Sequence, residues 1–439
     1  MAGALPRSLA VRRPVMDAIV RLIEPPDDNR SGSRNPLPND RSDPAMTTSP
    51  SRNPGLDTLR ACAIALVFMY HYEVFVSGAP TFGWLSDIGW AGVDLFFVLS
   101  GYLIANQLFA GMARGQALSL PRFYARRALR TLPVFWLVLA AFALFPAALG
   151  GRTPPPWWRF LTFTQNLGLQ PGTAFSHAWS LCVEEQFYLV LPALLALGAW
   201  LARGRVTLTR AHGWALMAAL VAVGVVARCV LWQTYGRPAD GRGDGYMAWI
   251  YYDTLCRFDE FIPGVAVAML KNFHRPTWDR LMARGGLLSA VGAVAVAVMM
   301  TLAYKRYFIS GYGWGFFMTG FGYSLIALAF AVLVMAALSP TARVLRWRVP
   351  GAQSLALWSY STYLSHKPLA YFLAQQLKPL GVSDGARLAV IGVACIAVGG
   401  LLYKGVEAPF MALRDRLVPS NFRDDGTCAP ALALSRPAG

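Results

Sequence analysis

The chain has 439 residues, of which 55% are hydrophobic and 14% are charged, and its formal net charge is +17. Soluble domains carry about a quarter of charged residues, and a single soluble core has no room for so many apolar side chains. The composition excludes an ordinary soluble enzyme and predicts a protein that buries apolar surface in a lipid bilayer. The basic residues fall between apolar runs, so we expect no nucleic-acid partner.

The N-terminal 54 residues differ in composition from the rest of the chain. Residues 25–54 are rich in Pro, Ser, Asn and charge, which predicts a disordered tail. No apolar segment of signal-peptide length occurs there, so we expect no secretory signal, and Met46 is an alternative start codon. The six Cys residues contain no C-x-x-C pair, and we interpret them as small buried side chains without a metal.

Apolar runs of about 20 residues are long enough to cross a bilayer as helices. Ten such runs follow one another, the sixth of them short: 56–76, 89–109, 131–149, 178–200, 213–234, 258–270, 285–304, 315–338, 352–376 and 388–406. The sequence therefore predicts an all-α polytopic membrane protein. We expect a cytoplasmic tail at 1–54, a membrane domain at 55–416 and a second cytoplasmic tail at 417–439.

The basic residues between these runs indicate an orientation. With the N-terminus in the cytoplasm, the inner loops are fewer than the outer loops, yet they hold more Lys and Arg. This distribution follows the positive-inside rule. We therefore expect both termini in the cytoplasm of a bacterium, with the bundle in its inner membrane.

Several ionisable residues lie inside the apolar runs, where they usually face a bundle interior and mark functional sites. Arg60 and His71 stand eleven residues apart in the first run, which places both on one helix face about 16 Å apart. Counting from the run ends brings two histidines and three carboxylates to one outer layer: His71, Asp94, Glu184, Glu185 and His366. The alternatives are a packing role for either histidine and a helix-capping role for Asp94.

A cluster of arginines precedes the third run at helical spacing: Arg122, Arg126, Arg127 and Arg130. One interpretation is contact with lipid head groups, and the other is a phosphate clamp, because guanidinium groups match phosphate oxygens. Ser100 stands in the context Leu99-Ser100-Gly101. This is not the G-x-S-x-G setting of a serine nucleophile, and we favour small-residue packing there.

These residues occur in a series of short motifs. In chain order the motifs are Arg60-x10-His71; Gly92-Val-Asp94-Leu-Phe96-Phe97-Val-Leu-Ser100-Gly101-Tyr102; Arg126-Arg127-x-x-Arg130-x-x-Pro133; His177-Ala-Trp179-Ser180-Leu181-x-x-Glu184-Glu185-Gln-Phe187-Tyr188; Arg257-Phe-Asp259; Ser359-Tyr360-x-x-Tyr363-Leu-x-His366-x-Pro368; and Glu407-x-Pro409. Each motif alone is a weak signal. Together and in this order they make the chain resemble the membrane-bound acyltransferase family 3, which includes bacterial O-antigen and exopolysaccharide O-acetylases.

The resemblance implies transfer of an acyl group, usually acetyl, from cytoplasmic acyl-coenzyme A to a hydroxyl of a cell-surface glycan or lipid-linked sugar. It implies that Arg60 and His71 are essential, with Glu184 and Arg127 or Arg130 in support. We expect the phosphates of the donor to be held by four arginines, Arg60, Arg126, Arg127 and Arg130. We expect the sugar to be contacted by Trp179, Glu185, Tyr188, Arg257, Asp259 and His366.

A chemical role for His71 follows from its residue type. A sugar hydroxyl attacks a thioester only when a base accepts its proton, and an imidazole suits that task near neutral pH. We expect His71 to be this base and Asp94 or Glu184 to hold its other ring nitrogen, while a covalent acyl-histidine route stays open. The alternative functions are acylation of a small secondary metabolite and proton-coupled transport or lipid flipping, although the sequence lacks the inverted repeats of many transporters.

Overall fold

The computed structural model describes residues 52–151, 154–203, 209–238, 243–343 and 347–423. The α-helices are α2 (Pro54–Tyr72), α3 (Trp84–Ile88), α4 (Ala91–Ala113), α5 (Leu120–Leu144), α6 (Pro146–Leu149), α7 (Trp157–Leu161), α8 (Trp179–Arg203), α9 (Arg210–Tyr235), α10 (Asp244–Tyr246), α11 (Ile262–Phe273), α12 (Arg275–Met282), α13 (Gly285–Arg306), α14 (Tyr323–Leu338), α15 (Ala352–Leu377), α16 (Asp384–Leu402) and α17 (Ala408–Leu417). This confirms the predicted all-α class.

Short π and 3-10 turns extend or join these helices: η1 (Glu73–Ser77), η2 (Ser176–Ala178), η3 (Met247–Tyr251), η4 (Thr254–Cys256), η5 (Phe258–Phe261), η6 (Met318–Gly322), η7 (Lys378–Leu380) and η8 (Tyr403–Glu407). The strands of the described residues have two residues each and form two antiparallel pairs: β1 (Ala117–Leu118) with β4 (Phe422–Arg423), and β2 (Phe308–Ile309) with β3 (Gly313–Trp314). The predicted tail from residue 1 to 51, with Met46, and the C-terminal residues from 424, with Cys428, lie outside the described residues.

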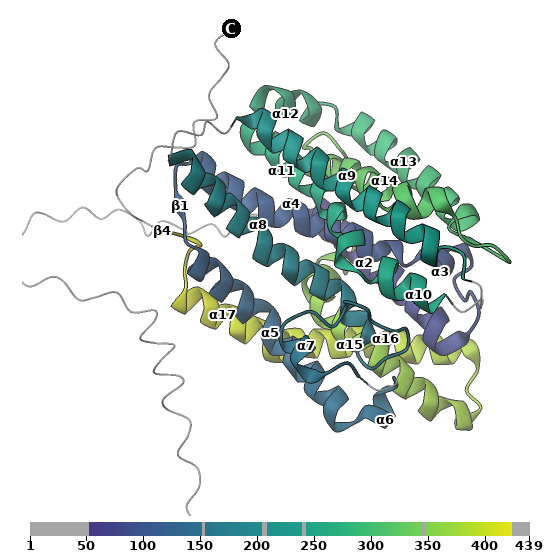
Figure 1. Cartoon of the computed structure of the whole chain (residues 1–439). Helices are drawn as coiled ribbons and strands as arrows, with labels where there is room; N and C mark the ends of the chain where they lie inside the picture. The colour runs from purple at the N-terminus through teal and green to yellow at the C-terminus, as the bar shows by residue number, and fades with distance from the viewer. Residues whose placement is uncertain (1–51, 152–153, 204–208, 239–242, 344–346, 424–439) are drawn as a thin grey trace, which may run out of the picture. The chain divides into compact units, whose positions relative to one another are not determined.

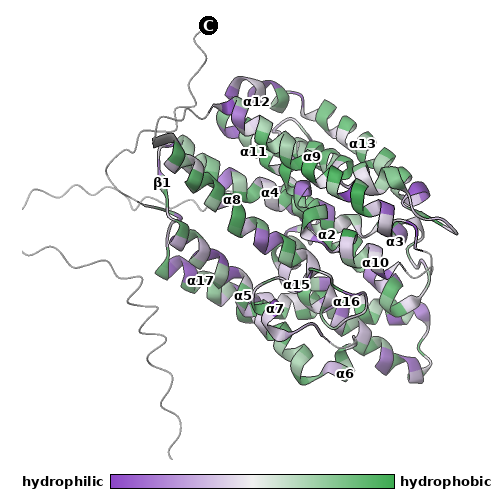
Figure 2. Cartoon of the chain, viewed as in Figure 1, coloured by the Kyte–Doolittle hydropathy of each residue, from purple (hydrophilic) through white to green (hydrophobic). Residues whose placement is uncertain are grey.

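Eight of the described helices are long and apolar enough to cross a membrane. They coincide with eight of the ten predicted runs, and Figure 2 shows hydrophobic residues along α4, α9 and α13 and hydrophilic ones at α12. The sixth predicted run corresponds to α11, which has 12 residues and follows two 3-10 turns. The ninth corresponds to α15, a helix of 26 residues with many polar side chains. The chain is thus a multi-pass membrane protein, and the count of ten spans stays a prediction.

Helix α2 carries both residues of the first motif without interruption. Asn53 caps it by accepting hydrogen bonds from the backbone N–H groups of Gly55 (2.9 Å) and Leu56 (3.3 Å), and Pro54 occupies the first turn, where its missing N–H costs nothing. Arg60 and His71 therefore lie on one helix, as predicted. We call the end of the bundle where α2 begins the arginine end and the end where α2 ends the histidine end.

Helix α4 lies at the centre of the described bundle and packs mainly against α11, α2 and α14. In its membrane-length window 67% of the residues are buried, compared with 17% in α9, which faces outward. Glycines allow the close approach. A Cβ on Gly92 would lie 2.4 Å from the carbonyl oxygen of Ala63, and a Cβ on Gly101 would lie 2.2 Å from that of Phe261. The motif residue Gly101 thus serves helix packing.

The segment before the third predicted run differs from the predicted loop. Residues from Leu120 onward already form the first turns of α5, so its arginines project from a helix. Helix α17 lies beside α5 (Figure 1), and beyond it β4 pairs with β1. The first residues of the predicted C-terminal tail, 417–423, are therefore packed against the membrane domain at the arginine end.

Candidate active site

Two histidines from distant parts of the chain meet at the histidine end. The Nδ1 atom of His71 on α2 lies 2.7 Å from the Nε2 atom of His366 on α15, and their rings stack with centroids 4.9 Å apart. The Nδ1 atom of His366 lies 2.8 Å from the carbonyl oxygen of Tyr363 and 3.1 Å from that of Thr362. Helix α15 packs directly against α2, which brings the two rings together.

These contacts assign the proton positions on both rings. A carbonyl oxygen only accepts hydrogen bonds, so the Nδ1 atom of His366 carries the hydrogen and its Nε2 atom is an acceptor. His71 must then donate from Nδ1, which leaves its Nε2 atom without a proton. A neutral His71 in this tautomer has a free lone pair and is chemically a base.

A third histidine, His177, belongs to the same group. Its ring centroid lies 5.8 Å from that of His366 and 6.4 Å from that of His71. Its Nε2 atom donates a hydrogen bond to the carbonyl oxygen of Leu364 (3.0 Å). Pro368 has no N–H group for that carbonyl, four residues earlier in α15. The proline of the ninth-run motif therefore frees the acceptor that His177 uses.

The loop that carries His177 is anchored to α15 and strained. The hydroxyl of Tyr363 donates to the carbonyl oxygen of His177 (2.7 Å) and contacts the hydroxyl of Ser180 (2.6 Å). Two residues before His177, Phe175 has a φ of 57°, in the left-handed region that non-glycine residues rarely adopt. Phe175 is buried among aromatic rings. Tightly packed strain of this kind is common at functional sites.

A cavity of about 170 Å³ opens beside His71 and His177. Its walls are mostly aromatic or aliphatic, and they include Tyr70, Phe75, Trp90, Trp179, Tyr251, Tyr252 and Tyr363. Lys367 also lines it. Trp179, predicted to contact the sugar, lies in this wall, whereas His366 reaches the cavity through its contact with His71.

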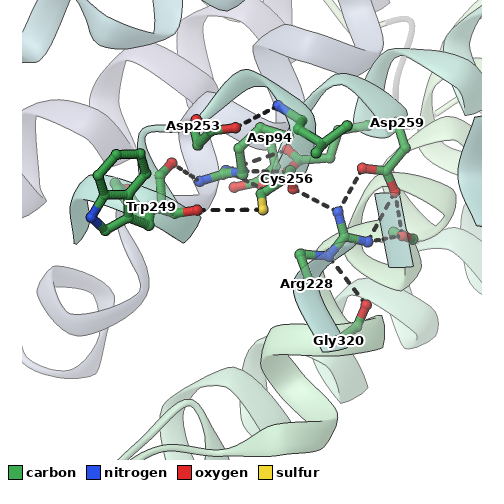
Figure 3. Close-up of polar contacts among 12 residues, drawn as sticks. Asp94, Arg228, Trp249, Asp253, Cys256, Asp259 and Gly320 are labelled. Atoms are coloured by element: carbon green, nitrogen blue, oxygen red, sulfur yellow. Dashed lines mark hydrogen bonds and ion pairs between the residues drawn. The ribbon is translucent and has the colours of Figure 1, made fainter. Parts of the chain in front are cut away.

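Asp94 does not hold His71, contrary to one of the two predicted pairings. Its Oδ1 atom accepts a hydrogen bond from the Nη2 atom of Arg257 (3.1 Å), and Arg257 also pairs with Glu260. All three side chains are 0% exposed. The position of a residue along a helix gives its depth but not the direction of its side chain. Asp94 does not line the cavity and belongs to a buried ion-pair cluster (Figure 3).

Arg257 and Asp259, both predicted to bind the sugar, belong to the same buried cluster and do not line the cavity. Asp259 pairs with Arg228 at 2.6 Å, and Arg228 also donates to the carbonyl oxygen of Gly320 (3.1 Å; Figure 3). The guanidinium carbon of Arg257 lies 5.0 Å from the ring of Trp179 and 4.8 Å from that of Tyr251. The cluster therefore supports the cavity wall from behind.

Glu184, the other predicted partner of His71, also has different neighbours. Its Oε1 atom accepts hydrogen bonds from the hydroxyls of Ser100 and Tyr188. Ser100 is therefore bound to a carboxylate, and its predicted packing role stays a prediction. Glu184, Glu185 and Tyr188 do not line the cavity, and their predicted catalytic and sugar-binding roles stay predictions.

The predicted phosphate clamp divides into two groups. Arg126 pairs with Asp415 at 3.0 Å and donates to the carbonyl oxygen of Val418, so it fastens α5 to α17. The side chains of Arg60, Arg127 and Arg130 form no hydrogen bond or ion pair within the described part of the chain, and the Nε atoms of Arg60 and Arg127 are buried without a partner. Arg130 lies close to both of the others. Three guanidinium groups without a hydrogen-bonded acceptor thus gather at the arginine end. The guanidinium of Arg127 lies 3.8 Å from the ring centroid of Tyr188, and Glu407 is the acidic neighbour of Arg130.

Most residues of the cavity wall were not selected from the sequence, and among them are a histidine, His177, and a lysine, Lys367. His177 stands just before the fourth predicted run, so depth counting left it outside the membrane layer. Lys367 follows His366 directly and carries no motif signal of its own. The His177-Ala-Trp179 motif gave the one usable signal, because its first residue is a histidine.

Comparison with known proteins gives matches over most of the chain. A family described as an acyltransferase domain, acyltransferase family 3, matches residues 53–404. YrhL of Bacillus subtilis (strain 168), provisionally named a peptidoglycan O-acetyltransferase, is 30% identical over 72% of this chain and 48% of its own length. The peptidoglycan O-acetyltransferase OatA of Listeria monocytogenes is 27% identical over 74% of this chain and 50% of its own.

The O-acetyltransferase OatA of Staphylococcus aureus (strain NCTC 8325 / PS 47) is 25% identical over 74% of this chain and 52% of its own length. The chain thus spans about half the length of these curated relatives. No solved structure shows a significant match.

Proposed function

The chain belongs to acyltransferase family 3, and from this membership we propose that it transfers an acyl group, with acetyl as the first candidate, from cytoplasmic acyl-coenzyme A to a sugar hydroxyl. The acceptor would be a cell-surface glycan or a lipid-linked sugar. The names of the relatives mention peptidoglycan, which is one such glycan. The chain spans about half of each relative, so we propose the acceptor only at the level of a sugar hydroxyl.

The observation that carries this proposal is the His71–His366 contact beside the cavity. It leaves the Nε2 atom of His71 unprotonated in a space with aromatic walls, which is the arrangement a general base needs. His71 takes the proton of the hydroxyl as its oxygen attacks the thioester carbonyl. The thiolate of coenzyme A then leaves and takes that proton from the imidazolium. The base returns to its starting state, and no net proton is consumed.

The three arginines without a hydrogen-bonded acceptor support a phosphate site for the donor at the arginine end. A buried guanidinium N–H group without an acceptor is costly inside a membrane bundle, and phosphate oxygens are strong acceptors for it. We propose that Arg60, Arg127 and Arg130 bind the phosphates, while Arg126 holds α17. Arg60 and His71 lie on one unbroken helix, eleven positions apart along the chain, which is about 16 Å of rise. A slender pantetheine arm would cover this span while the nucleotide stays outside.

The direction of the reaction follows from this arrangement. Acyl-coenzyme A is made in the cytoplasm, so we propose that the arginine end faces the cytoplasm and the histidine end faces the opposite side of the bacterial inner membrane. The surplus of basic residues in the loops of the arginine end supports this orientation. Both termini would then be cytoplasmic.

The test uses the full chain purified into lipid nanodiscs, with labelled acetyl-coenzyme A and a panel of sugar and small-metabolite acceptors. We expect release of coenzyme A and label on a sugar, and a rate at least about 100-fold lower for His71→Gln. His212→Gln is the matched control, because His212 contacts Thr209 at the start of α9. If His71→Gln reacts at a rate near that of the wild type, His71 is not the base. If the wild-type chain neither cleaves the thioester nor labels an acceptor, the result contradicts acyl transfer and favours a transporter.

A further inference from the structure

Lys367 places a positive charge in the wall of the cavity beside His71 and His177. It follows His366 on α15, and its Nζ atom donates a hydrogen bond to the hydroxyl of Ser176 (2.9 Å). The same Nζ atom lies 4.0 Å from the centroid of the Phe75 ring. Ser176 and Phe75 both line the cavity. The ammonium group is therefore held at the cavity by two neutral neighbours.

No acidic group balances this charge within the described part of the chain. Lys367 forms no ion pair there, and the described residues that line the cavity include no Asp or Glu. Asp94 and Glu260, near this end, pair with Arg257. Glu73, in the same turn as Phe75, neighbours Asp87 and Ser86 and forms no ion pair with Lys367. A charge in a membrane bundle without a counter-charge is costly and usually marks a ligand site. An anionic group entering the cavity would supply the missing counter-charge.

The position of the ammonium group indicates which oxygen it would meet. Phe75 follows His71 by four residues, about one helical turn, and their ring centroids lie 5.6 Å apart. Lys367 sits over the Phe75 ring on this side of the cavity. The ammonium group and the His71 ring thus both neighbour the ring of Phe75. A group bound by Lys367 would therefore lie on the same substrate as the hydroxyl that meets His71.

We propose that the cavity selects acceptors that carry an anionic oxygen group, a carboxylate or a phosphate, near the accepting hydroxyl, and that Lys367 is the counter-ion that recognises it. This inference rests on the proposed function for the identity of the ligand as an acceptor. The aromatic wall of Trp179, Tyr251 and Tyr252 provides flat apolar faces for the sugar ring. Small sites of this kind combine apolar walls with a few polar groups that fix orientation.

The test measures equilibrium binding of three sugars to the full chain in nanodiscs: methyl glucoside, methyl glucuronoside and glucose 6-phosphate. Binding needs no acyl donor, so it stays measurable even if acyl transfer fails and separates the two proposals. We expect the wild-type chain to bind at least one anionic sugar at least about tenfold more tightly than methyl glucoside, since a hydrogen bond to a charged group is strong. The carboxylate and phosphate arms identify the preferred anion.

The Lys367→Met variant should lose this preference and keep its affinity for methyl glucoside, while Lys367→Arg should retain the preference. Lys271→Met is the matched control, because Lys271 is another partly buried lysine held by a hydroxyl, that of Tyr102 (3.0 Å), outside the cavity. If Lys367→Met does not fold, Lys367→Gln is measured in its place, with methyl glucoside binding as the check on folding. A wild-type chain with no preference, or a neutral variant that keeps it, overturns the proposal.

Discussion

The Nδ1 atom of His71 lies 2.7 Å from the Nε2 atom of His366, so one imidazole orients another at the proposed catalytic position. In a Ser-His-Asp triad, a carboxylate occupies the place that His366 takes here. A neutral imidazole fixes the tautomer of the base equally well, but it brings no negative charge for the imidazolium that forms. The negative charge that stabilises this imidazolium must therefore come from the reacting oxygens.

Replacing His366 tests this relationship. His366→Phe removes the acceptor for the Nδ1 hydrogen of His71, so His71 loses its fixed tautomer, and we expect kcat to fall about 10- to 100-fold with little change in the donor KM. His366→Gln should recover part of the rate, because its side-chain oxygen accepts a hydrogen bond. The measurement is steady-state kinetics over a range of pH. An unchanged kcat in His366→Phe would show that the contact does not serve catalysis.

The two groups of arginines predict different kinetic effects. Arg60→Ala removes one of the unpaired guanidinium groups, and we expect the donor KM to rise about 10- to 100-fold, the loss of one charge-assisted hydrogen bond. Arg126→Ala should leave the donor KM within about threefold and lower the thermal stability instead, because Arg126 contacts Asp415 and the carbonyl of Val418. Equal effects of both variants on KM would contradict the division of the clamp.

From the sequence we predicted which helices carry the site residues better than we predicted the contacts of their side chains. Arg60 and His71 on one face of α2 follow from helical periodicity, and the order of spans follows from hydropathy. The partner of Asp94 could not be predicted, because the position of a residue along a helix does not give the direction of its side chain. Arg257 reaches Asp94 from a loop. His177 was missed because a folded-back loop, and not a span, brings it to the two other histidines.

A charge count in the buried cluster gives a further prediction. Two guanidinium groups, of Arg228 and Arg257, face three carboxyl groups, of Asp94, Asp259 and Glu260, all 0% exposed. Neutrality in this apolar setting requires one extra proton, and Asp94 and Glu260 share Arg257 and lie next to each other. Asn at position 94 imitates a protonated Asp.

We therefore expect Asp94→Asn to keep its thermal stability within about 1 kcal/mol and to keep its acyl-transfer rate, since Asn retains the acceptor for Arg257. Arg257→Met leaves carboxyl groups without their cation and should lose about 3–5 kcal/mol of stability. Thermal unfolding and kinetics in nanodiscs measure both. A rate loss of 100-fold in a stable Asp94→Asn variant would instead assign Asp94 to the chemistry, as the sequence suggested.

Pro368 provides a case in which stability and activity should change in opposite directions. A proline inside a helix costs about 3 kcal/mol, because it removes a hydrogen bond and its ring clashes with the preceding turn. Here the missing backbone hydrogen bond leaves the carbonyl oxygen of Leu364 free to accept a hydrogen bond from His177. In Pro368→Ala the new N–H group competes for this carbonyl and α15 is free to straighten, which weakens the anchor of the loop that carries His177.

We expect Pro368→Ala to raise the unfolding temperature and to lower kcat about tenfold, whereas most destabilising variants lower both. Pro192→Ala in α8 is the matched control, because it also restores an N–H group inside a long helix, away from the three histidines. This control should gain stability and keep its rate. If Pro368→Ala also gains stability at full activity, the hydrogen bond from His177 to Leu364 does not position the site.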